Sequence, residues 1–110
     1  MKTFIQGKVG KDFTTEQAQA HAKLIARCLL KTVKRTVGDL DKVKKVVKIV
    51  GFVNCTDDYK EQPEVINGCS NFMMQVFGPD KGAHARSAVG TNSLPRQVPV
   101  EIEAIFEIEA

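Results

Sequence analysis

The chain has 110 residues, a mass of 12.1 kDa and 43% hydrophobic residues, which suits a single domain over residues 1–110 with one modest core. Its formal charge of +3 combines twelve Lys/Arg and four Asp/Glu in residues 1–48 with four and nine in residues 49–110, a division that favours a solvated lysine-rich helix face over a nucleic-acid surface. No apolar run approaches the roughly 18 residues that span a bilayer and the first ten residues lack signal-peptide blocks, so we expect a cytoplasmic protein with no membrane partner.

A weak strand is expected before Gly7, and a long helix after it. Thr14 and Gln17 form a Thr-x-x-Gln capping box, in which each side chain can bond the other residue's backbone N–H. Gly38 can adopt the left-handed conformation that closes a helix. The apolar stripe between these ends, at steps of three and four, comprises Ala18, Ala22, Ile25, Cys28, Leu29, Val33 and Val37.

Residues 43–54 are rich in β-branched side chains and predict one long strand with apolar groups on both faces. Strict alternation assigns Val43, Val47, Ile49 and Val53 to one face and Val46, Val50 and Phe52 to the other. A strand that is apolar on both faces must be covered on both. Because the chain offers only two helices, we expect another copy of the chain to provide the second cover.

The second helix is expected to start near Asp57 or Asp58, either of which can cap it, with Pro63 in the first turn. It should end at the Gly78-Pro79 pair. Its apolar stripe comprises Val65, Ile66, Cys69, Phe72, Met73, Val76 and Phe77.

Two further strands are expected, a short one over residues 86–90 and a long one over residues 97–109. In the long strand Val98, Val100, Ile102, Ala104, Phe106 and Ile108 alternate with glutamates. The order strand, helix, strand, helix, strand, strand predicts an α+β two-layer sandwich, a mixed β-sheet with two helices on one face.

The three cysteines, Cys28, Cys55 and Cys69, fit neither a disulfide framework nor a CxxC metal or redox pair. Their number is odd and their spacings are wide. We expect all three to be reduced, small residues in the core or at its margin.

Arg86 and Glu101 are the candidate chemical residues. A lone arginine opens a short strand of small residues, and a glutamate lies in the strand that follows the turn at Leu94-Pro95. If the two strands pair as neighbours, both side chains can reach one cleft. The alternative is that Arg86 only forms a structural ion pair with the acidic strand.

These residues resemble the signature of the YjgF-like reactive intermediate deaminase (Rid) family, also called the endoribonuclease L-PSP family. The similarity lies in the Ala-Arg-Ser segment at residues 85–87 and in the Val-Glu-Ile-Glu-Ala segment at residues 100–104 after Leu-Pro. It extends back through both predicted helices and the strand between them. The chain thus resembles the family over nearly its whole length.

The resemblance implies a chorismate-mutase-like fold and a homotrimer with a cleft between subunits for a small carboxylate-bearing ligand. Arg86 would grip the carboxylate of a 2-imino acid, and Glu101 would help to position a water. Ser87 and Ala88 would lie around the same ligand. His84 lies near Arg86 in the sequence and would either touch the ligand or be a solvent-exposed loop histidine. The implied activity is hydrolysis of 2-iminobutanoate or 2-iminopropanoate to a 2-oxo acid and ammonia, without a metal or cofactor.

Two strands that family members normally carry before this segment are expected to be missing, which removes part of the pocket wall. A second hypothesis is therefore a noncatalytic trimer that binds small carboxylates. A third, ranked last, is RNA binding or cleavage, since no aromatic platform accompanies the lysines and no plausible general acid and base pair is evident.

Overall fold

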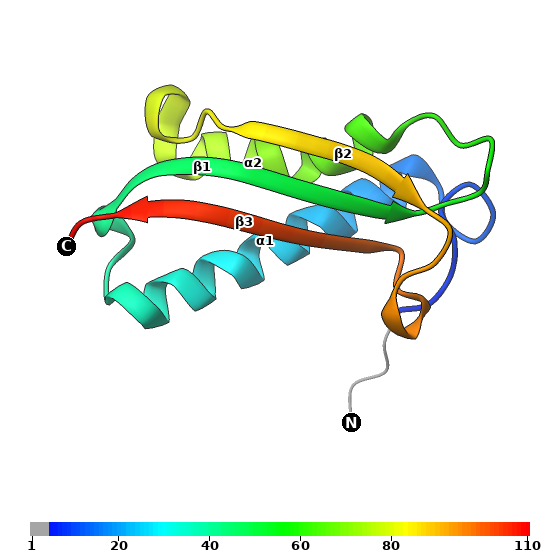
Figure 1. Ribbon diagram of the computed structural model, residues 1–110, viewed down its shortest axis with the longest axis horizontal. Helices are drawn as coiled ribbons and strands as arrows, with labels where there is room; N and C mark the ends of the chain where they lie inside the picture. Colours follow the sequence, from blue (N-terminus) through cyan, green and yellow to red (C-terminus); the bar gives the residue numbers. More distant parts are fainter. Residues whose placement is uncertain (1–4) are drawn as a thin grey trace.

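The computed structural model describes residues 5–110 and is an α+β fold with a three-stranded sheet in front of two helices (Figure 1). The expected α+β class and the single-sided helix layer are confirmed. In chain order the elements are α1 (Thr15–Val37), a 3-10 turn (Leu40–Lys42), β1 (Val43–Asn54), α2 (Gln62–Lys81), β2 (Ala85–Thr91), a second 3-10 turn (Pro95–Gln97) and β3 (Val100–Ile108).

The sheet has the order β2-β1-β3, so the long strand β1 lies in the middle. It runs parallel to β2, which it reaches through α2, and antiparallel to β3. The strands β2 and β3 are therefore not neighbours, and the pairing that would bring Arg86 and Glu101 together in one chain does not occur. Both strands lie at the edges of the sheet formed by residues 5–110.

Helix α1 has the predicted ends. Thr14 Oγ1 accepts from the Gln17 N–H at 3.1 Å, the Gln17 side chain accepts from the Thr14 N–H at 2.9 Å, and Gly38 ends the helix with φ 93°. The buried face differs from the predicted stripe, because it follows steps of four residues along Ala18, Ala22, Ala26 and Leu30. Cys28 is consequently exposed and is not a core residue, whereas Cys55 and Cys69 are buried as expected.

The small residues on α1 allow α2 to approach closely. A side-chain carbon at Gly68 of α2 would lie 2.1 Å from the Gln19 carbonyl oxygen, which leaves room only for glycine. The two helices thus form one compact layer behind the sheet (Figure 1).

Strand β1 has the predicted bounds but not the predicted alternation. The register against β3 shifts twice, between Val43 and Lys45 and between Val46 and Lys48. At each shift β1 contains one residue more than β3. Such bulges reverse the faces of the residues between them. Val46 is therefore fully buried against the helices, and Val47 is 41% exposed, the reverse of the assignment from strict alternation.

Helix α2 begins later than predicted. Its cap is Glu61, whose side chain makes no capping bond, and Pro63 lies in the first turn as expected. Asp58 instead accepts a hydrogen bond from Thr56 in the preceding turn, at 2.8 Å. The helical geometry breaks at Gly78 (φ 84°, ψ 173°), as predicted, while Val76 is 41% exposed and lies outside the core.

The segment before α1 forms no extended strand within residues 5–14, where Val9 makes only isolated bridges. The expected strand before Gly7 is thus not seen there, and its first four residues lie outside the described part. Instead the segment closes one end of the sheet. Lys8 Nζ donates to Asn54 Oδ1 at 3.0 Å and to the Asn92 carbonyl, and the Val9 N–H donates to the Asn54 carbonyl at 2.8 Å.

The two faces of the sheet have different surroundings. One face packs on the helices through Ile49 and Val53 of β1 and Val100 and Ile102 of β3, all of which are buried. We call the other side the open face; in Figure 1 it faces the viewer, and no helix of residues 5–110 covers it. From the strand register, its central residues are Lys48, Val50, Phe52, Ala85, Ser87, Val89, Glu101, Glu103 and Ile105.

No helix in residues 5–110 is long and apolar enough to cross a membrane.

Candidate functional site

Arg86 lies on the edge strand β2, on the helix side of the sheet. Its register partner on β1 is Ile49, a fully buried residue of the helix-covered face. Arg86 is half-buried, and its guanidinium Nη1 donates to Ser70 Oγ of α2 at 3.1 Å. Arg86 therefore lies where the sheet edge meets the second helix.

Ser70 connects Arg86 to His84, which precedes β2. Ser70 Oγ lies 2.8 Å from His84 Nε2, and His84 Nδ1 lies 2.6 Å from the Gly82 carbonyl oxygen. Because a carbonyl can only accept, Nδ1 carries a proton, and in the neutral tautomer that this fixes, Nε2 accepts the Ser70 hydroxyl proton. Donation therefore runs from Arg86 to Ser70, from Ser70 to His84, and from His84 to Gly82.

The charge of Arg86 has no acidic partner within the described part of the chain. No carboxylate of residues 5–110 bonds or pairs with it, and it donates to the neutral Ser70 hydroxyl. The structural ion pair with β3 is thus not formed in one chain, since β1 separates the two strands. The remaining guanidinium donors are available to an anion.

The neighbouring thiol is poorly suited to nucleophilic chemistry. Burial raises the pKa of Cys69 to about 11, although the positive charge of Arg86 acts in the opposite direction. Since the thiolate is the reactive form, Cys69 stays protonated at neutral pH.

Glu101 lies on the open face, away from Arg86. Its register partner on β1 is Phe52, and its carboxylate is exposed. Ser87 also lies on the open face, opposite Val50, while Ala88 lies beside Gly51 on the same side as Arg86. One chain thus brings together Arg86, Ala88 and His84, and separates them from Glu101 and Ser87.

Sequence reasoning missed Ser70. It is the one hydroxyl in a run of apolar helix residues, between Cys69 and Met73, and only 9% of its surface is exposed. A buried polar side chain needs a hydrogen-bonding partner, so this position could have been noticed. Its partners could not have been named, because they come from another element.

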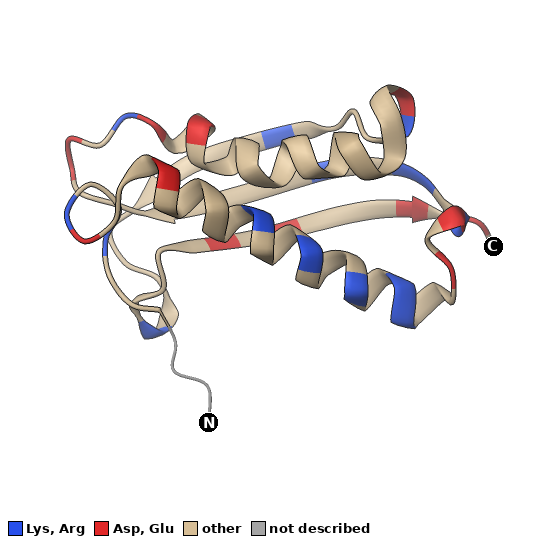
Figure 2. Ribbon diagram, turned by 180° about the vertical axis from the view of Figure 1, so that it is seen from behind, with Lys and Arg blue, Asp and Glu red and all other residues tan. Residues whose placement is uncertain are grey.

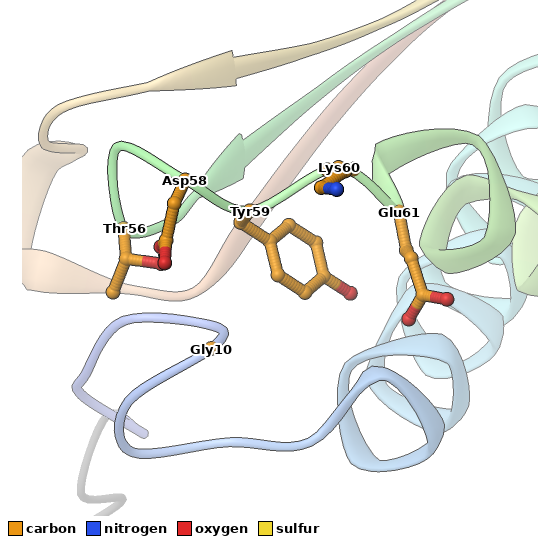
Figure 3. A pocket seen from close by; sticks show the side chains of 6 residues that line it. All are labelled: Gly10, Thr56, Asp58, Tyr59, Lys60 and Glu61. Atoms are coloured by element: carbon orange, nitrogen blue, oxygen red, sulfur yellow. The ribbon is translucent and has the colours of Figure 1, made fainter.

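A hollow of about 420 Å³ lies elsewhere, at the turn between β1 and α2 (Figure 3). Gly10, Thr56, Asp58, Tyr59, Lys60 and Glu61 line it. Tyr59 Oη lies 2.5 Å from Thr15 Oγ1, which donates to Glu61 at 2.6 Å, and burial raises the pKa of Tyr59. These bonds join the turn to α1.

A smaller hollow of about 270 Å³ lies on the sheet and is lined by Lys48, Val50, Glu103, Ala104 and Ile105. Neither this hollow nor the one in Figure 3 includes Arg86. Within residues 5–110 no group of three or more His, Cys, Asp and Glu is placed to hold a metal ion.

Comparison with known proteins gives similarities over nearly the whole chain. Residues 1–103 match the family model described as "YjgF/chorismate mutase-like, putative endoribonuclease". Protein TCP17 of Trypanosoma cruzi is 40% identical over 102 residues, which are 93% of this chain and 64% of that protein. The chain thus spans less than two thirds of the length of this relative.

Two solved structures are similar. The crystal structure of Atu1372 from Agrobacterium tumefaciens, a protein of unknown function, matches with a TM-score of 0.93 and 45% sequence identity. The match covers 98% of this chain and 70% of the Atu1372 chain. The crystal structure of a "putative endoribonuclease" from Shewanella oneidensis has a TM-score of 0.91 and 23% identity over 97% of this chain and 70% of its own, a likeness in fold alone.

Proposed function

Since the chain belongs to the YjgF/chorismate mutase-like family, we propose that it is a deaminase-type hydrolase that converts reactive 2-imino acids to 2-oxo acids and ammonia. The observation that carries the proposal is the state of Arg86. A half-buried guanidinium with a neutral hydroxyl partner and no acidic partner in residues 5–110 favours an anionic ligand. We propose that this ligand is the carboxylate of a small 2-imino acid.

Arginine suits this ligand for a geometric reason. Its planar fork of N–H donors meets the two oxygens of a carboxylate with parallel hydrogen bonds, which fixes the orientation of the substrate as well as its position. With Nη1 bonded to Ser70, the other donors remain for the substrate. Ala88 is small and on the same side, so it leaves space beside the guanidinium.

We place the complete site between copies of the chain. Arg86 and Glu101 lie on opposite faces of the sheet with β1 between them, so a site that uses both needs a second subunit. The open face supports this, because Val89 and Ile105 are 44% and 58% exposed beside the half-buried Val50 and Phe52. Covering these side chains in a cytoplasmic homotrimer would remove apolar surface from water.

In the proposed reaction the water oxygen bonds to the imine carbon while one water proton moves to the nitrogen. The hydroxyl proton of the resulting carbinolamine moves to its amino nitrogen, the C–N bond breaks with its electron pair leaving on ammonia, and the C=O bond of the 2-oxo acid forms. Glu101 from another subunit would hold the water through its carboxylate. Because free imines already hydrolyse quickly, binding and orientation would supply most of the acceleration.

A noncatalytic trimer that binds small carboxylates is the second candidate, and it would use the same Arg86. RNA binding is ranked below both. The basic residues of α1, seen as a row of blue bands in Figure 2, are exposed. Contacts from such a row are to phosphates, so any RNA binding should be weak, nonspecific and salt-sensitive.

The test couples an amino-acid oxidase, as the imine source, to detection of the 2-oxo acid. Arg86→Ala should lose the acceleration at an unchanged melting temperature, at a cost of roughly 2 to 5 kcal/mol in binding. Arg86→Lys keeps the charge without the fork and should recover only part, and Glu101→Gln should retain binding and lose rate. If the wild type gives no acceleration but is stabilised by 2-oxobutanoate through Arg86, the protein is the carboxylate binder. Early melting of Arg86→Ala without any ligand effect contradicts both.

A further inference from the structure

We propose that Ser70 and His84 are positioning residues that aim the Arg86 guanidinium at its carboxylate ligand. The inference rests on the proposed function, and it reassigns His84 from a ligand contact to a support of the arginine. It comes from three bonds that join three elements: α2 supplies Ser70, the loop before β2 supplies His84, and β2 supplies Arg86.

The first step is the directionality of these bonds. His84 Nδ1 must donate to the Gly82 carbonyl, so the tautomer of the neutral ring is fixed and Nε2 is an acceptor. The Ser70 hydroxyl proton is then committed to Nε2 at 2.8 Å. This leaves the Oγ lone pairs for Arg86 Nη1, so the backbone carbonyl ultimately sets the orientation of the hydroxyl.

The second step is the accessibility of the groups. Ser70 is a buried residue of α2 and only 9% exposed, so its Oγ is poorly placed to attack a substrate. Both His84 nitrogens are engaged inside the chain, so the ring has no nitrogen left for a ligand. Of the three side chains, Arg86 alone has spare donors, and the other two act through it.

The third step is what an arginine loses without support. Its side chain has many rotamers, and immobilising them on binding costs affinity. A guanidinium already held at Nη1 has part of this cost removed before the ligand arrives. Loss of the Ser70 hydroxyl should therefore weaken carboxylate binding far more than it slows the chemical step, which appears as a raised KM with kcat nearly unchanged.

The experiment compares Ser70→Ala, Ser70→Thr and His84→Ala with two matched controls, Ser93→Ala and His21→Gln, which replace the same residue types outside this cluster. Ser93 is exposed and His21 lies on α1. The readouts are KM and kcat with oxidase-generated 2-iminobutanoate, the Kd of 2-oxobutanoate by calorimetry, the melting temperature, and the Arg86 Nε–Hε signal in ¹⁵N NMR spectra without ligand.

Ser70→Ala and His84→Ala should raise KM and Kd about tenfold, with kcat within about threefold, and should broaden the Arg86 Nε–Hε signal. Ser70→Thr keeps the hydroxyl and should recover most of the affinity, and the controls should keep the wild-type KM, kcat and Kd. Unchanged KM and Kd in folded Ser70→Ala overturn the inference, as does a fall in kcat at constant KM. An Nε–Hε signal unaffected by Ser70→Ala also overturns it. A wild type that neither hydrolyses the imine nor binds 2-oxobutanoate, with a signal that still responds to Ser70→Ala, overturns the proposed function instead.

Discussion

Neighbouring residues of β1 have opposite surroundings, although their side chains are chemically alike. Ile49 is fully buried under the helices, whereas Val50, the next residue, lies half-buried on the open face beside Ser87 and Glu103. The helix side is completed by the chain itself. The open side carries valine, phenylalanine and isoleucine side chains that no helix of residues 5–110 covers, so the proposed association of copies would use this face.

The same comparison divides the candidate site. Arg86 belongs to the helix side through Ile49 and Ser70, and Glu101 belongs to the open side through Phe52. A reaction that needs both Arg86 and Glu101 therefore depends on residues from both faces of the sheet. Substitutions on the two sides should consequently have different signatures.

The largest effect is expected from Val50→Asp. Burying an ionised carboxylate without a partner costs far more than the contacts of one valine contribute, and a trimer would bury three copies together. We expect the assembly to fall to monomers that keep the wild-type circular dichroism spectrum. Light scattering at micromolar concentration measures the mass, with Ser93→Asp as the control on an exposed loop. A wild type that is already monomeric would contradict the prediction.

The next effect concerns the helix side. Ile49→Ala should lower the free energy of unfolding by about 2 to 5 kcal/mol, because it removes buried methyl groups and leaves a cavity under the helices. Urea unfolding at fixed protein concentration measures this. Val47→Ala, on the same strand but 41% exposed, should cost less than about 1 kcal/mol. Equal losses of stability in the two variants would contradict the assignment of Ile49 to the core and Val47 to the surface.

The smallest effect is a pH dependence in the helix layer. Burial lowers the pKa of His21 below its usual 6.5, so the unfolded chain binds a proton more readily than the folded one. Stability should be unaffected by His21 above about pH 7.5 and should fall as the pH drops through 6.5 toward the folded value. The difference between wild type and His21→Gln in thermal melts from pH 8 to 5 isolates this contribution. If the wild type instead became more stable relative to His21→Gln as the pH falls, the result would contradict the prediction.

Much of the fold is predictable from local pattern. The capping box at Thr14, the bounds of β1 and the alternation of β3 from Val100 to Phe106 are properties of short segments, and the structure confirms them. The last strand is shorter than the predicted 97–109, and Ile108 at its end is exposed. The faces of Val46 and Val47 depend on bulges against β3, which are set by pairing between distant segments. The exposure of Cys28 depends likewise on how α1 is turned toward its neighbours.

The candidate site was less predictable for the same reason. Arg86 and Glu101 were singled out by residue type and resemblance, and their roles remain proposals. Their strands were expected to be possible neighbours, but β1 lies between them. Ser70 lies in an apolar helix stripe and was not singled out from the sequence. Its hydrogen-bonding partners, His84 and Arg86, lie 14 and 16 positions further along the chain.

The contacts of Lys8 have a consequence for synthesis. This side chain bonds Asn54 and the Asn92 carbonyl, and the latter lies 84 residues away in sequence. At typical elongation rates of ~5 to 20 residues per second, the partner follows about 4 to 17 seconds after the lysine. The bonds of Lys8 and Val9 to Asn54 need only the first half of the chain, whereas the bond to Asn92 waits until β2 has been made, and β3 follows later still. The N-terminal segment can therefore hold the end of β1 at Asn54 before either edge strand of the sheet exists.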